Sequence, residues 1–582
     1  MLSKTPQFDR VLDEYFSKLE LDEKGGQWRV CRFSGEKFYV RPEDVEFYKS
    51  IRVPLPTLEP EERRRRRCAS YNSYTLFKKI SAYSGKNIIS VYPSSSPYQI
   101  YEHQVWYSDI WDPFEYARIY SPAQNFFSQF RELQLEVPRA SLISDSTNVN
   151  SDFTNVSKNL RNCYITFDQN GGEDLYYHQC CEQDKNCIEC WALYNSDTCY
   201  ESKIGMNLFK CFWCEETYDT IESYFLWDCR NSEHCFMSSN LRNKKYYFRN
   251  EYVGKEEFEK RIREVNFGNY TEVQKLKQEF REVKNNAPHK ANNNQRSINV
   301  SGDYIWDSKN IHFGLWIDSS ENIAYSEGMT RTRDSYDILG GSNGEFCYEL
   351  ANVWAENDYG CKFSMQVDNS REIEYCDSCR NCRNCFGCVG LANKEFCIFN
   401  RQYPEEEYWQ TVDKIKTSML ADSEYGEFFS PKLMPVPYRS TVNAYYPGLD
   451  DYETAGKYGY DVSLLEESHE EVVGETIKSS ELPLDIKDVG DEILQKIIVD
   501  TANNKKFRLV KPELEFYRKY GIPLPRINPY TRMSIWRKEF NIVVRLYRRK
   551  CVRCDKEIQA VYAPDAPEKN IWCEECYLKE LG

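Results

Sequence analysis

A pair of mostly apolar positions recurs every twelve residues through the middle of the chain, between stretches that are largely polar. The first series is Cys163-Tyr164, Leu175-Tyr176, Cys187-Ile188, Cys199-Tyr200, Cys211-Phe212, Ser223-Tyr224, Cys235-Phe236 and Tyr247-Phe248. A fixed short period indicates one structural unit stacked on copies of itself. We therefore expect a β-solenoid with twelve-residue rungs, each with two or three short strands separated by corners.

The same period returns in a second series. Its pairs are Ile311-His312, Ile323-Ala324, Ser335-Tyr336 and Cys347-Tyr348 and, after a two-residue insertion, Cys361-Lys362, Ile373-Glu374, Cys385-Phe386 and Cys397-Ile398. The expected corners carry the turn formers Asn162, Asp174, Asn186, Asn310, Asn322 and Asp334. The first member of each pair should point inward, where cysteine fits because it is small and readily buried.

Three segments outside the series have the spacing of amphipathic helices. One lies near residues 255–265 and another near residues 404–415, so that a helix follows each series. Because the last rung of a solenoid exposes a strand edge, we expect both helices to be caps. Residues 1–28 should form an N-terminal amphipathic helix with the apolar positions Val11, Leu12, Tyr15, Phe16 and Leu19.

Four cysteines near the C-terminus have the spacing of a metal site. Cys551-x-x-Cys554 and Cys573-x-x-Cys576 are separated by eighteen residues, a pattern typical of a zinc ribbon. Each Cys-x-x-Cys turn aims two thiolates at one point, and tetrahedral Zn²⁺ takes four ligands. We expect one structural Zn²⁺ with no open position. The alternative is a reduced or redox-active set of thiols.

The two ends of the chain are copies of one module. Residues 38–56 align with residues 507–525, and Val91-Tyr92 aligns with Val561-Tyr562. The N-terminal copy has Ser81, Ser84, Glu102 and Val105 where the C-terminal copy has its four cysteines, so it should fold without zinc.

These patterns predict a mainly β protein with two tandem β-solenoids between two zinc-ribbon-like modules. The expected segments are the N-terminal helix (1–28), a degenerate zinc-ribbon-like module (29–140), β-solenoid 1 with capping helices (141–290), β-solenoid 2 with its capping helix (291–421), an acidic connector (422–504) and a zinc-ribbon module (505–582).

The combination of Cys-x-x-Cys-x-Lys-Glu-Ile from Cys551, Tyr-x-Pro-Asp-x-Pro from Tyr562 and Cys-x-x-Cys-Tyr from Cys573 with the solenoid turns resembles an uncharacterised family. Its members are cysteine-rich zinc-ribbon and β-solenoid proteins of candidate-phyla-radiation bacteria. The resemblance covers most of the chain and implies no established activity. The family often has a further Cys-x-x-Cys in an upstream proline segment. Here the corresponding segments, 58–62 and 527–531, contain none.

The composition indicates the compartment and the kinds of partner to expect for this chain. The 582 residues include 24 cysteines, and neither a signal peptide nor an apolar run of membrane-spanning length is visible. We therefore expect a cytoplasmic protein with reduced thiols and no membrane partner. The formal net charge is -15, yet residues 505–582 hold 18 Lys+Arg against 10 Asp+Glu, about +8. Any nucleic-acid contact is expected there, at Arg545, Arg548, Arg549, Lys550 and Arg553.

Two further clusters have competing interpretations. Cys376, Cys379, Cys382, Cys385 and Cys388 recur every three residues and suit either a second metal site or stacked core thiols. The run from Arg63 to Arg67 suits a phosphate-binding patch, but the spacing of Glu59, Glu61 and Glu62 from these arginines favours the solvated face of a helix.

Repeats dominate over catalytic motifs, so the leading hypothesis is a non-enzymatic scaffold or binding protein. Its solenoid surface would hold a macromolecular partner, protein or RNA, and its basic zinc ribbon would be a contact point. One alternative is a β-helix enzyme acting on polysaccharide, with surface carboxylates and tyrosines as acid and base. Another is a self-assembling structural protein. No small-molecule substrate is indicated, and the oligomeric state stays open.

Overall fold

The computed structural model describes residues 3–72, 74–352, 355–465, 474–539 and 545–581, so the expected limits at residues 1 and 582 lie outside it. The protein is strand-rich, with 30% strand and 27% helix. It divides into two compact units, each built from separate stretches of chain. Unit 1 contains residues 3–142 and 293–465. Unit 2 contains residues 143–292, 474–539 and 545–581. Each unit therefore combines one repeat series with one chain-end module.

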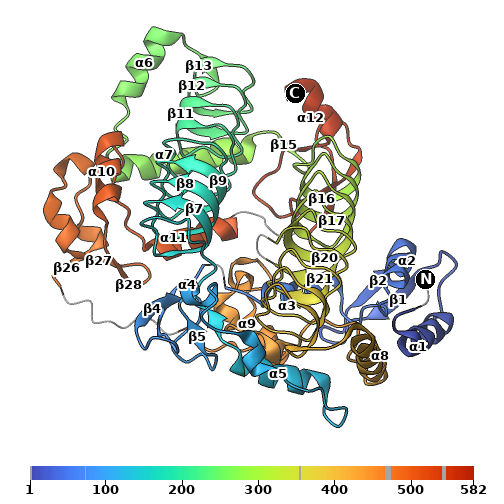
Figure 1. Ribbon diagram of the computed structural model, residues 1–582. Helices are drawn as coiled ribbons and strands as arrows, with labels where there is room; N and C mark the ends of the chain where they lie inside the picture. The colour runs from blue at the N-terminus through green and yellow to red at the C-terminus, as the bar shows by residue number, and fades with distance from the viewer. Residues whose placement is uncertain (1–2, 73, 353–354, 466–473, 540–544, 582) are drawn as a thin grey trace. The chain divides into compact units, whose positions relative to one another are not determined.

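Unit 2 contains a ladder of parallel strands. They are β7 (Thr154–Arg161), β8 (Thr166–Glu173), β9 (Gln179–Lys185), β10 (Phe209–Phe212), β11 (Ile221–Trp227), β12 (Glu233–Ser239) and β13 (Lys245–Phe248), drawn in Figure 1 as stacked coils. Paired residues are twelve apart. One column of pairs runs unbroken through Glu173, Lys185, Asp197, Phe209, Ile221, Glu233 and Lys245.

Each twelve-residue rung of this ladder has four paired positions, where the sequence suggested two or three strands. In one rung they are Glu173, Tyr176, Gln179 and Glu182. The residue after each of them, Asp174, Tyr177, Cys180 and Gln183, has a left-handed backbone with φ between 54° and 64°. A left-handed residue at every third position turns the chain through a corner. This conformation is costly for L-residues, and it persists here because the ladder fixes it on both sides.

The residue after each left-handed corner points into a narrow core. Leu175, Cys187 and Ser223 are among these fully buried residues. Inward polar atoms find partners on the backbone: Ser223 Oγ donates to the Ile221 carbonyl (2.9 Å) and accepts from the Cys235 N–H (3.1 Å). The Cys187 thiol likewise donates to the Lys185 carbonyl (3.0 Å). These inward thiols and hydroxyls thus fill the core while their own polar atoms are hydrogen-bonded to the backbone.

Unit 1 contains a second ladder with the same pairing. Its strands are β16 (Ile298–Trp306), β17 (Lys309–Asp318), β18 (Glu321–Ala324), β19 (Glu327–Thr330), β20 (Arg333–Ser342), β21 (Tyr348–Ala351), β22 (Lys362–Met365), β23 (Arg383–Phe386) and β24 (Glu395–Ile398). The register is twelve from β17 to β21 and becomes fourteen between Tyr348 and Lys362, where two residues are inserted.

The turn formers singled out in the sequence occupy corners in both ladders. Asn162, Asp174, Asn186, Asn310, Asn322 and Asp334 all have left-handed backbones, with φ between 46° and 57°. Their side chains add a second ladder of hydrogen bonds: Asn310 donates to Asn322 (3.0 Å), which donates to Asp334 (2.8 Å). Asn and Asp are selected here because they tolerate this conformation and bond along the stack.

Both ladders end in an antiparallel turn and a helix. β14 (Glu251–Tyr252) pairs with β13, and β25 (Arg401–Gln402) pairs with β24. The helices α6 (Lys255–Glu264) and α8 (Glu405–Ala421) follow, with Phe258 and Tyr408 buried. Asp413 of α8 also caps α1 (Pro6–Ser17), accepting from the Phe8 N–H at 2.7 Å. The antiparallel turns and the helices after β13 and β24 therefore cover the last strand edges of the two ladders.

Further helices cover two sides of the ladder in unit 2. They are α7 (Tyr270–Asn286), α10 (Lys511–Tyr520) and α11 (Pro529–Glu539). Lys284 of α7 reaches Glu215 at 2.6 Å, and Tyr177 donates to Glu513 of α10 at 3.1 Å. Figure 1 shows α7 lying along β11 and β12.

The arginine run is buried, so the expectation of a solvated helix face was wrong. Residues 60–68 form α3 (Pro60–Cys68), and Arg63, Arg65, Arg66 and Arg67 are each at most 4% exposed. Asp337 of β20 accepts from Arg63 (3.0 Å) and Arg67 (2.9 Å). Asp337 lies some 270 residues further along the chain, whereas Arg65 pairs locally with Glu62 (3.0 Å). The nearby glutamates in the sequence suggested local pairs for the whole run.

The segment expected as an acidic connector contains ordered elements and contributes to both units. Residues up to 465 belong to unit 1, where Tyr438 accepts from Arg65 (2.8 Å) and Asn443 donates to the Arg65 carbonyl (3.0 Å). From residue 474 onward, β26 (Thr476–Lys478), β27 (Ile497–Asp500) and β28 (Lys505–Phe507) form a small sheet in unit 2. Among the described helices, none is long and apolar enough to cross a membrane.

Replacing Asp337 with alanine should destabilise unit 1 by about 3–5 kcal/mol, because two buried guanidinium groups lose their shared partner. Urea unfolding, monitored by hydrogen exchange of β20 and β21, measures this change in stability. The control is Glu14→Ala, which removes an exposed pair with Lys18 and should leave the stability nearly unchanged. Equal effects of the two substitutions would contradict a buried ionic core.

Acid should weaken the attachment of α7 to its ladder. Burial raises the pKa of Glu215, but the ammonium groups of Lys284 and Lys203 outweigh it and hold the pKa at about 2, below the ordinary 4.5. A depressed carboxyl pKa gives stability that is present above pH 4.5 and lost as the pH falls towards 2. Glu215→Gln should flatten this part of the pH–stability curve, whereas the exposed-site control Glu272→Gln should not. Parallel curves for wild type and Glu215→Gln would show that the pair is not coupled to folding.

Candidate metal centre

The first pair of cysteines lies in a tight turn of the C-terminal module. β29 (Tyr547–Lys550) and β30 (Glu557–Ala560) form an antiparallel hairpin around it. The Cys551 N–H donates to the Lys556 carbonyl (2.9 Å), and the Asp555 N–H donates to the Cys551 carbonyl (2.9 Å). Asp555 is left-handed, with φ at 57°. The turn therefore presents both thiols of the Cys-x-x-Cys sequence on one side.

The second pair lies where a short strand meets a helix. β31 (Ile571–Trp572) precedes Cys573, and Cys576 is in the first turn of α12 (Glu574–Leu581). The Val552 N–H donates to the Ile571 carbonyl (3.0 Å), which holds the first turn against the strand. The Tyr577 N–H donates to the Cys573 carbonyl (3.0 Å) and begins the helix.

The four cysteines predicted from their spacing come together. The Sγ atoms of Cys551, Cys554, Cys573 and Cys576 all lie within 4.8 Å of one another. Cys554 Sγ is 3.8 Å from Cys573 Sγ. A tetrahedron of sulfurs about 2.3 Å from a central zinc has sulfur–sulfur edges of about 3.8 Å. The donor set and its spacing thus fit one metal ion, with no place for a further ligand.

Backbone N–H groups favour thiolates at this site. The Cys573 N–H donates to Cys551 Sγ (3.2 Å), and the Cys576 N–H donates to Cys573 Sγ (3.4 Å). Burial raises the pKa of Cys551, but the N–H groups of Cys573, Arg553 and Cys554 lower it to about 6. The neighbouring sulfur of Cys573 raises the pKa of Cys576 to about 12. A bound cation would relieve this conflict by stabilising all four sulfurs as thiolates.

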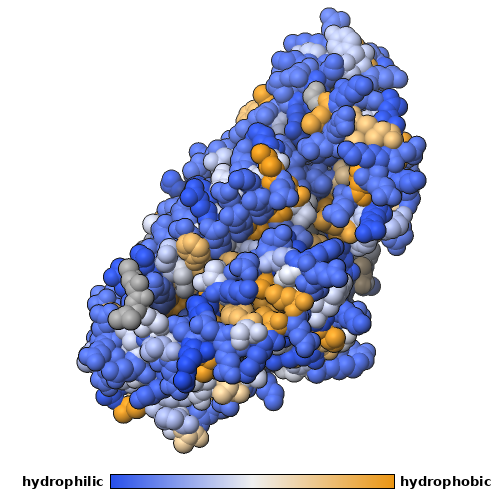
Figure 2. All heavy atoms as spheres, turned by 90° about the vertical axis from the view of Figure 1, so that its right-hand side faces the viewer, coloured by the Kyte–Doolittle hydropathy of each residue, from blue (hydrophilic) through white to orange (hydrophobic). Residues whose placement is uncertain are grey.

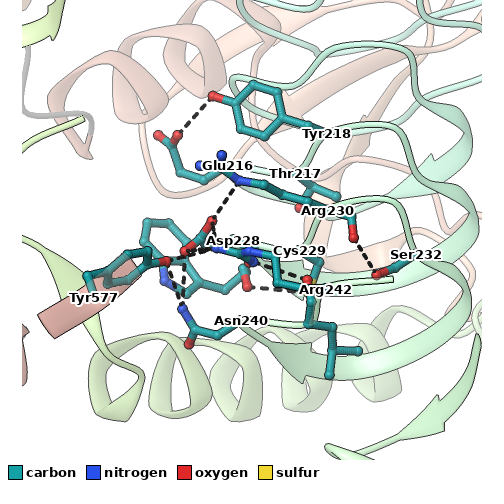
Figure 3. Close-up of polar contacts among 12 residues, drawn as sticks. Glu216, Thr217, Tyr218, Asp228, Cys229, Arg230, Ser232, Asn240, Arg242 and Tyr577 are labelled. Atoms are coloured by element: carbon teal, nitrogen blue, oxygen red, sulfur yellow. Dashed lines mark hydrogen bonds and ion pairs between the residues drawn. The ribbon is translucent and has the colours of Figure 1, made fainter. Parts of the chain in front are cut away.

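The centre is fixed to the ladder of unit 2. β31 pairs in parallel with β15 (His289–Lys290). The Tyr577 hydroxyl of α12 accepts from Asn240 (3.2 Å) and Arg242 (3.1 Å), and Arg242 forms a two-pronged ion pair with Asp228 (3.0 and 3.1 Å). Figure 3 shows this network, which joins Tyr577 to neighbouring rungs. The residue after the last cysteine thus ties the metal centre to a rigid body.

In the N-terminal copy of the module, side-chain hydrogen bonds take the place of a metal centre. β3 (Phe77–Ile80) and β4 (Asn87–Ser90) form the hairpin, and the Ser81 N–H donates to the Lys86 carbonyl (2.8 Å), as in the C-terminal turn. Ser81 Oγ donates to one oxygen of Glu102 (2.5 Å), and Ser84 Oγ donates to the other. Val105 lies on the short helix α4 (His103–Trp106). A carboxylate shared by two hydroxyls closes this module.

Two further turns of the same kind were missed in the sequence. β1 (Gln27–Val30) and β2 (Lys37–Val40) flank Cys31, whose N–H donates to the Glu36 carbonyl (2.8 Å), and Ser34 donates to Glu59. β27 ends at Asp500, just before the turn to β28, and the Asp500 carboxylate accepts from the Asn528 N–H (3.1 Å). The turn at Cys31 has a sequence signal: residues 32–35 and 82–85 share the pattern x-x-Ser-Gly.

Only some side chains of the basic cluster beside the metal centre are exposed and point away from the module. Arg545, Arg548, Lys550 and Arg553 are exposed, and Arg548 and Lys550 lie on the outer side of β29. Arg549 is half-buried and donates to the Ala563 carbonyl at 2.7 Å. Arg553 pairs with Glu580 (2.5 Å) and lies 5.7 Å from the centroid of Trp572. The five residues therefore divide between outer and module-stabilising positions.

The cysteines that recur every three residues in unit 1 point into its ladder. Cys376, Cys379, Cys382, Cys385 and Cys388 are at most 2% exposed. The first four occupy the four inward positions of one rung, and each donates to a backbone carbonyl, as Cys382 does to Arg380 at 3.3 Å. Among the described residues, only the C-terminal four have ligand atoms mutually within 4.8 Å. Core packing accounts for the unit 1 thiols.

Comparisons of the chain with protein-family models, curated proteins and solved structures returned no match. The site's chemistry therefore rests on its own geometry.

Removing two of the four sulfurs should remove a bound metal ion. In the double variant Cys554→Ser, Cys576→Ser, we expect one metal equivalent fewer per chain and faster hydrogen exchange in residues 545–581, because the ion joins the two turns. Elemental analysis and exchange mass spectrometry measure these changes. The matched control, Ser81→Ala with Ser84→Ala, should keep the full metal content. Unchanged metal content in the cysteine variant would contradict this assignment.

Proposed function

We propose that this protein is a non-enzymatic, zinc-containing scaffold that binds another protein. In this proposal the two ladders are four-sided β-solenoids, and the four C-terminal cysteines form a zinc ribbon with one structural Zn²⁺. Four thiolates and no open position favour zinc in a structural role. None of the described cysteines is in a disulfide, which supports a reducing, cytoplasmic setting.

The observation that carries the proposal is an apolar strip on the uncovered sides of the unit 2 ladder. Its members are Tyr194, Met206, Phe209 and Ile221, which are 38–42% exposed. Phe209 pairs directly with Ile221, and Met206 pairs with Tyr218. The Asn207 N–H bonds the Tyr194 carbonyl at 3.0 Å, so neighbouring rungs hold the strip together. The side chains are therefore presented side by side on a rigid surface.

Such a strip differs from scattered exposed apolar residues. Figure 2 shows one face of the molecule as largely hydrophilic, with several hydrophobic patches, the broadest near the middle of the view. Contiguous apolar residues with a polar surround are typical of protein-binding surfaces, where aromatic and methionine side chains are enriched. The strip combines tyrosine, phenylalanine, methionine and isoleucine, which fits this composition.

The charges around the strip favour a protein partner over RNA. Glu182 and Asp219 are exposed beside it, and the chain's formal net charge is -15. Nucleic acid needs local positive potential along its phosphates. Arg548 and Lys550 on the outer side of β29 make RNA the second candidate. Arg549 and Arg553 have protein partners, which leaves a small basic footprint.

A photo-crosslinking residue placed at Met206 should form one defined adduct with a protein in extract of the source cells. Unlabelled wild-type protein should compete the adduct away. Met206→Glu protein should compete at least tenfold less well, because a buried charge is costly at an apolar interface. Ile298→Glu, which alters an exposed apolar residue of unit 1, is the matched control and should compete like wild type.

Three results would contradict the proposal. An adduct that nuclease destroys would make the partner a nucleic acid. An adduct with a second copy of the chain would indicate self-assembly, and light scattering would then show an oligomer that Met206→Glu dissolves. No competable adduct would leave the strip without a binding role.

A further inference from the structure

One histidine lies inside the ladder of unit 2 without a hydrogen-bond partner. His178 follows the left-handed corner at Tyr177, points inward and is fully buried. Neither Nδ1 nor Nε2 makes a hydrogen bond. Its Nε2 lies 3.6 Å from the carboxylate of Asp184, which is also fully buried. A buried imidazole with two unsatisfied nitrogens is costly, so an ion or ligand that pairs with it would stabilise the core.

Three thiols surround the same point of the core. Cys187, Cys190 and Cys199 point into the core from the two rungs that follow His178, and their thiols donate to backbone carbonyls of those rungs. All four side chains are fully buried. Cys187 and Cys199 are twelve residues apart on one side of the ladder, and His178 and Cys190 are twelve apart on the next. The register of the ladder thus places two donors from each of two adjacent sides around one axis.

We propose that His178, Cys187, Cys190 and Cys199 bind a second Zn²⁺ inside the ladder. One imidazole and three thiolates form a ligand set of structural zinc sites. Asp184 takes the position of the carboxylate that orients a metal-binding histidine through its other nitrogen.

Binding changes the hydrogen bonds of the thiols. Cys187 donates to the Lys185 carbonyl (3.0 Å) and Cys190 to the Ile188 carbonyl (3.4 Å). Three thiol protons leave to solvent when the three sulfurs bind the ion, and the imidazole binds in its neutral form. Among the described residues, no three of these four ligand atoms lie within 4.8 Å of one another. The side chains must therefore rotate towards the ion as it binds.

The test begins with full-length protein that lacks the C-terminal site, the double variant Cys554→Ser, Cys576→Ser, purified with added Zn²⁺. We expect one zinc equivalent to remain after dialysis. Adding His178→Gln or Cys187→Ser to this background should reduce it to none. The matched control is Cys229→Ser, which removes an inward thiol of the same ladder that donates only to carbonyls, at 3.5 and 3.8 Å. This control should keep the zinc.

Zinc X-ray absorption on the same double variant gives a second measurement that needs no substitution in the core. We expect a shell of three sulfurs and one nitrogen. A folded double variant without zinc would overturn the proposal, as would a shell of four sulfurs. Retention of the ion in folded His178→Gln protein would overturn it too. If Cys382→Ser removes the zinc instead, the ion lies in the ladder of unit 1, and this result would equally overturn the proposal. If the core variants do not fold, the absorption shell decides.

Discussion

The structure depends on parallel hydrogen bonding at a register of twelve residues. Each bridged residue bonds the following rung through its N–H and its carbonyl, and the residues on either side of it bond the previous rung. A left-handed residue at every third position turns the chain onto the next of four sides. The corner conformation is unfavourable for residues such as Tyr177 and Trp213, so it holds only where the ladder fixes both flanks. Any shift of the register would move whole columns of side chains to other sides.

That register decides which residues serve which purpose. Inward columns favour compact side chains, which explains the number of cysteines and serines around His178. On the covered sides, outward columns hold helices through ion pairs. Lys284 of α7 forms a partly buried pair with Glu215 in unit 2, and Arg63 of α3 forms a buried pair with Asp337 in unit 1. The uncovered sides keep the strip from Tyr194 to Ile221. Core chemistry, docking of helices and an exposed apolar strip are therefore three consequences of one repeat.

Local patterns could be predicted from the sequence, and pairings between distant segments could not. The spacing of twelve and the four C-terminal cysteines are visible because each lies within a short stretch, and the structure brings those cysteines together. The burial of Arg63 and Arg67 was hidden because Asp337 and Glu349 lie some 270 residues away, whereas Glu59 and Glu62 lie nearby. The four sides of a rung were missed because a three-residue period with left-handed corners has no strong propensity signal. The turn at Cys31 was missed because serine and glutamate replace its expected partners.

The most direct test of the twelve-residue register is a set of distances along one outer column of the unit 2 ladder. Spin labels on non-natural residues at Lys185 and Glu233 span four rungs, and labels at Lys185 and Lys245 span five. With about 4.8 Å between neighbouring strands, pulsed dipolar spectroscopy should give backbone separations of about 19 and 24 Å. The increment per twelve residues should be constant. Separations that do not grow by one strand spacing per rung would contradict the stacked arrangement and the assignments that depend on it.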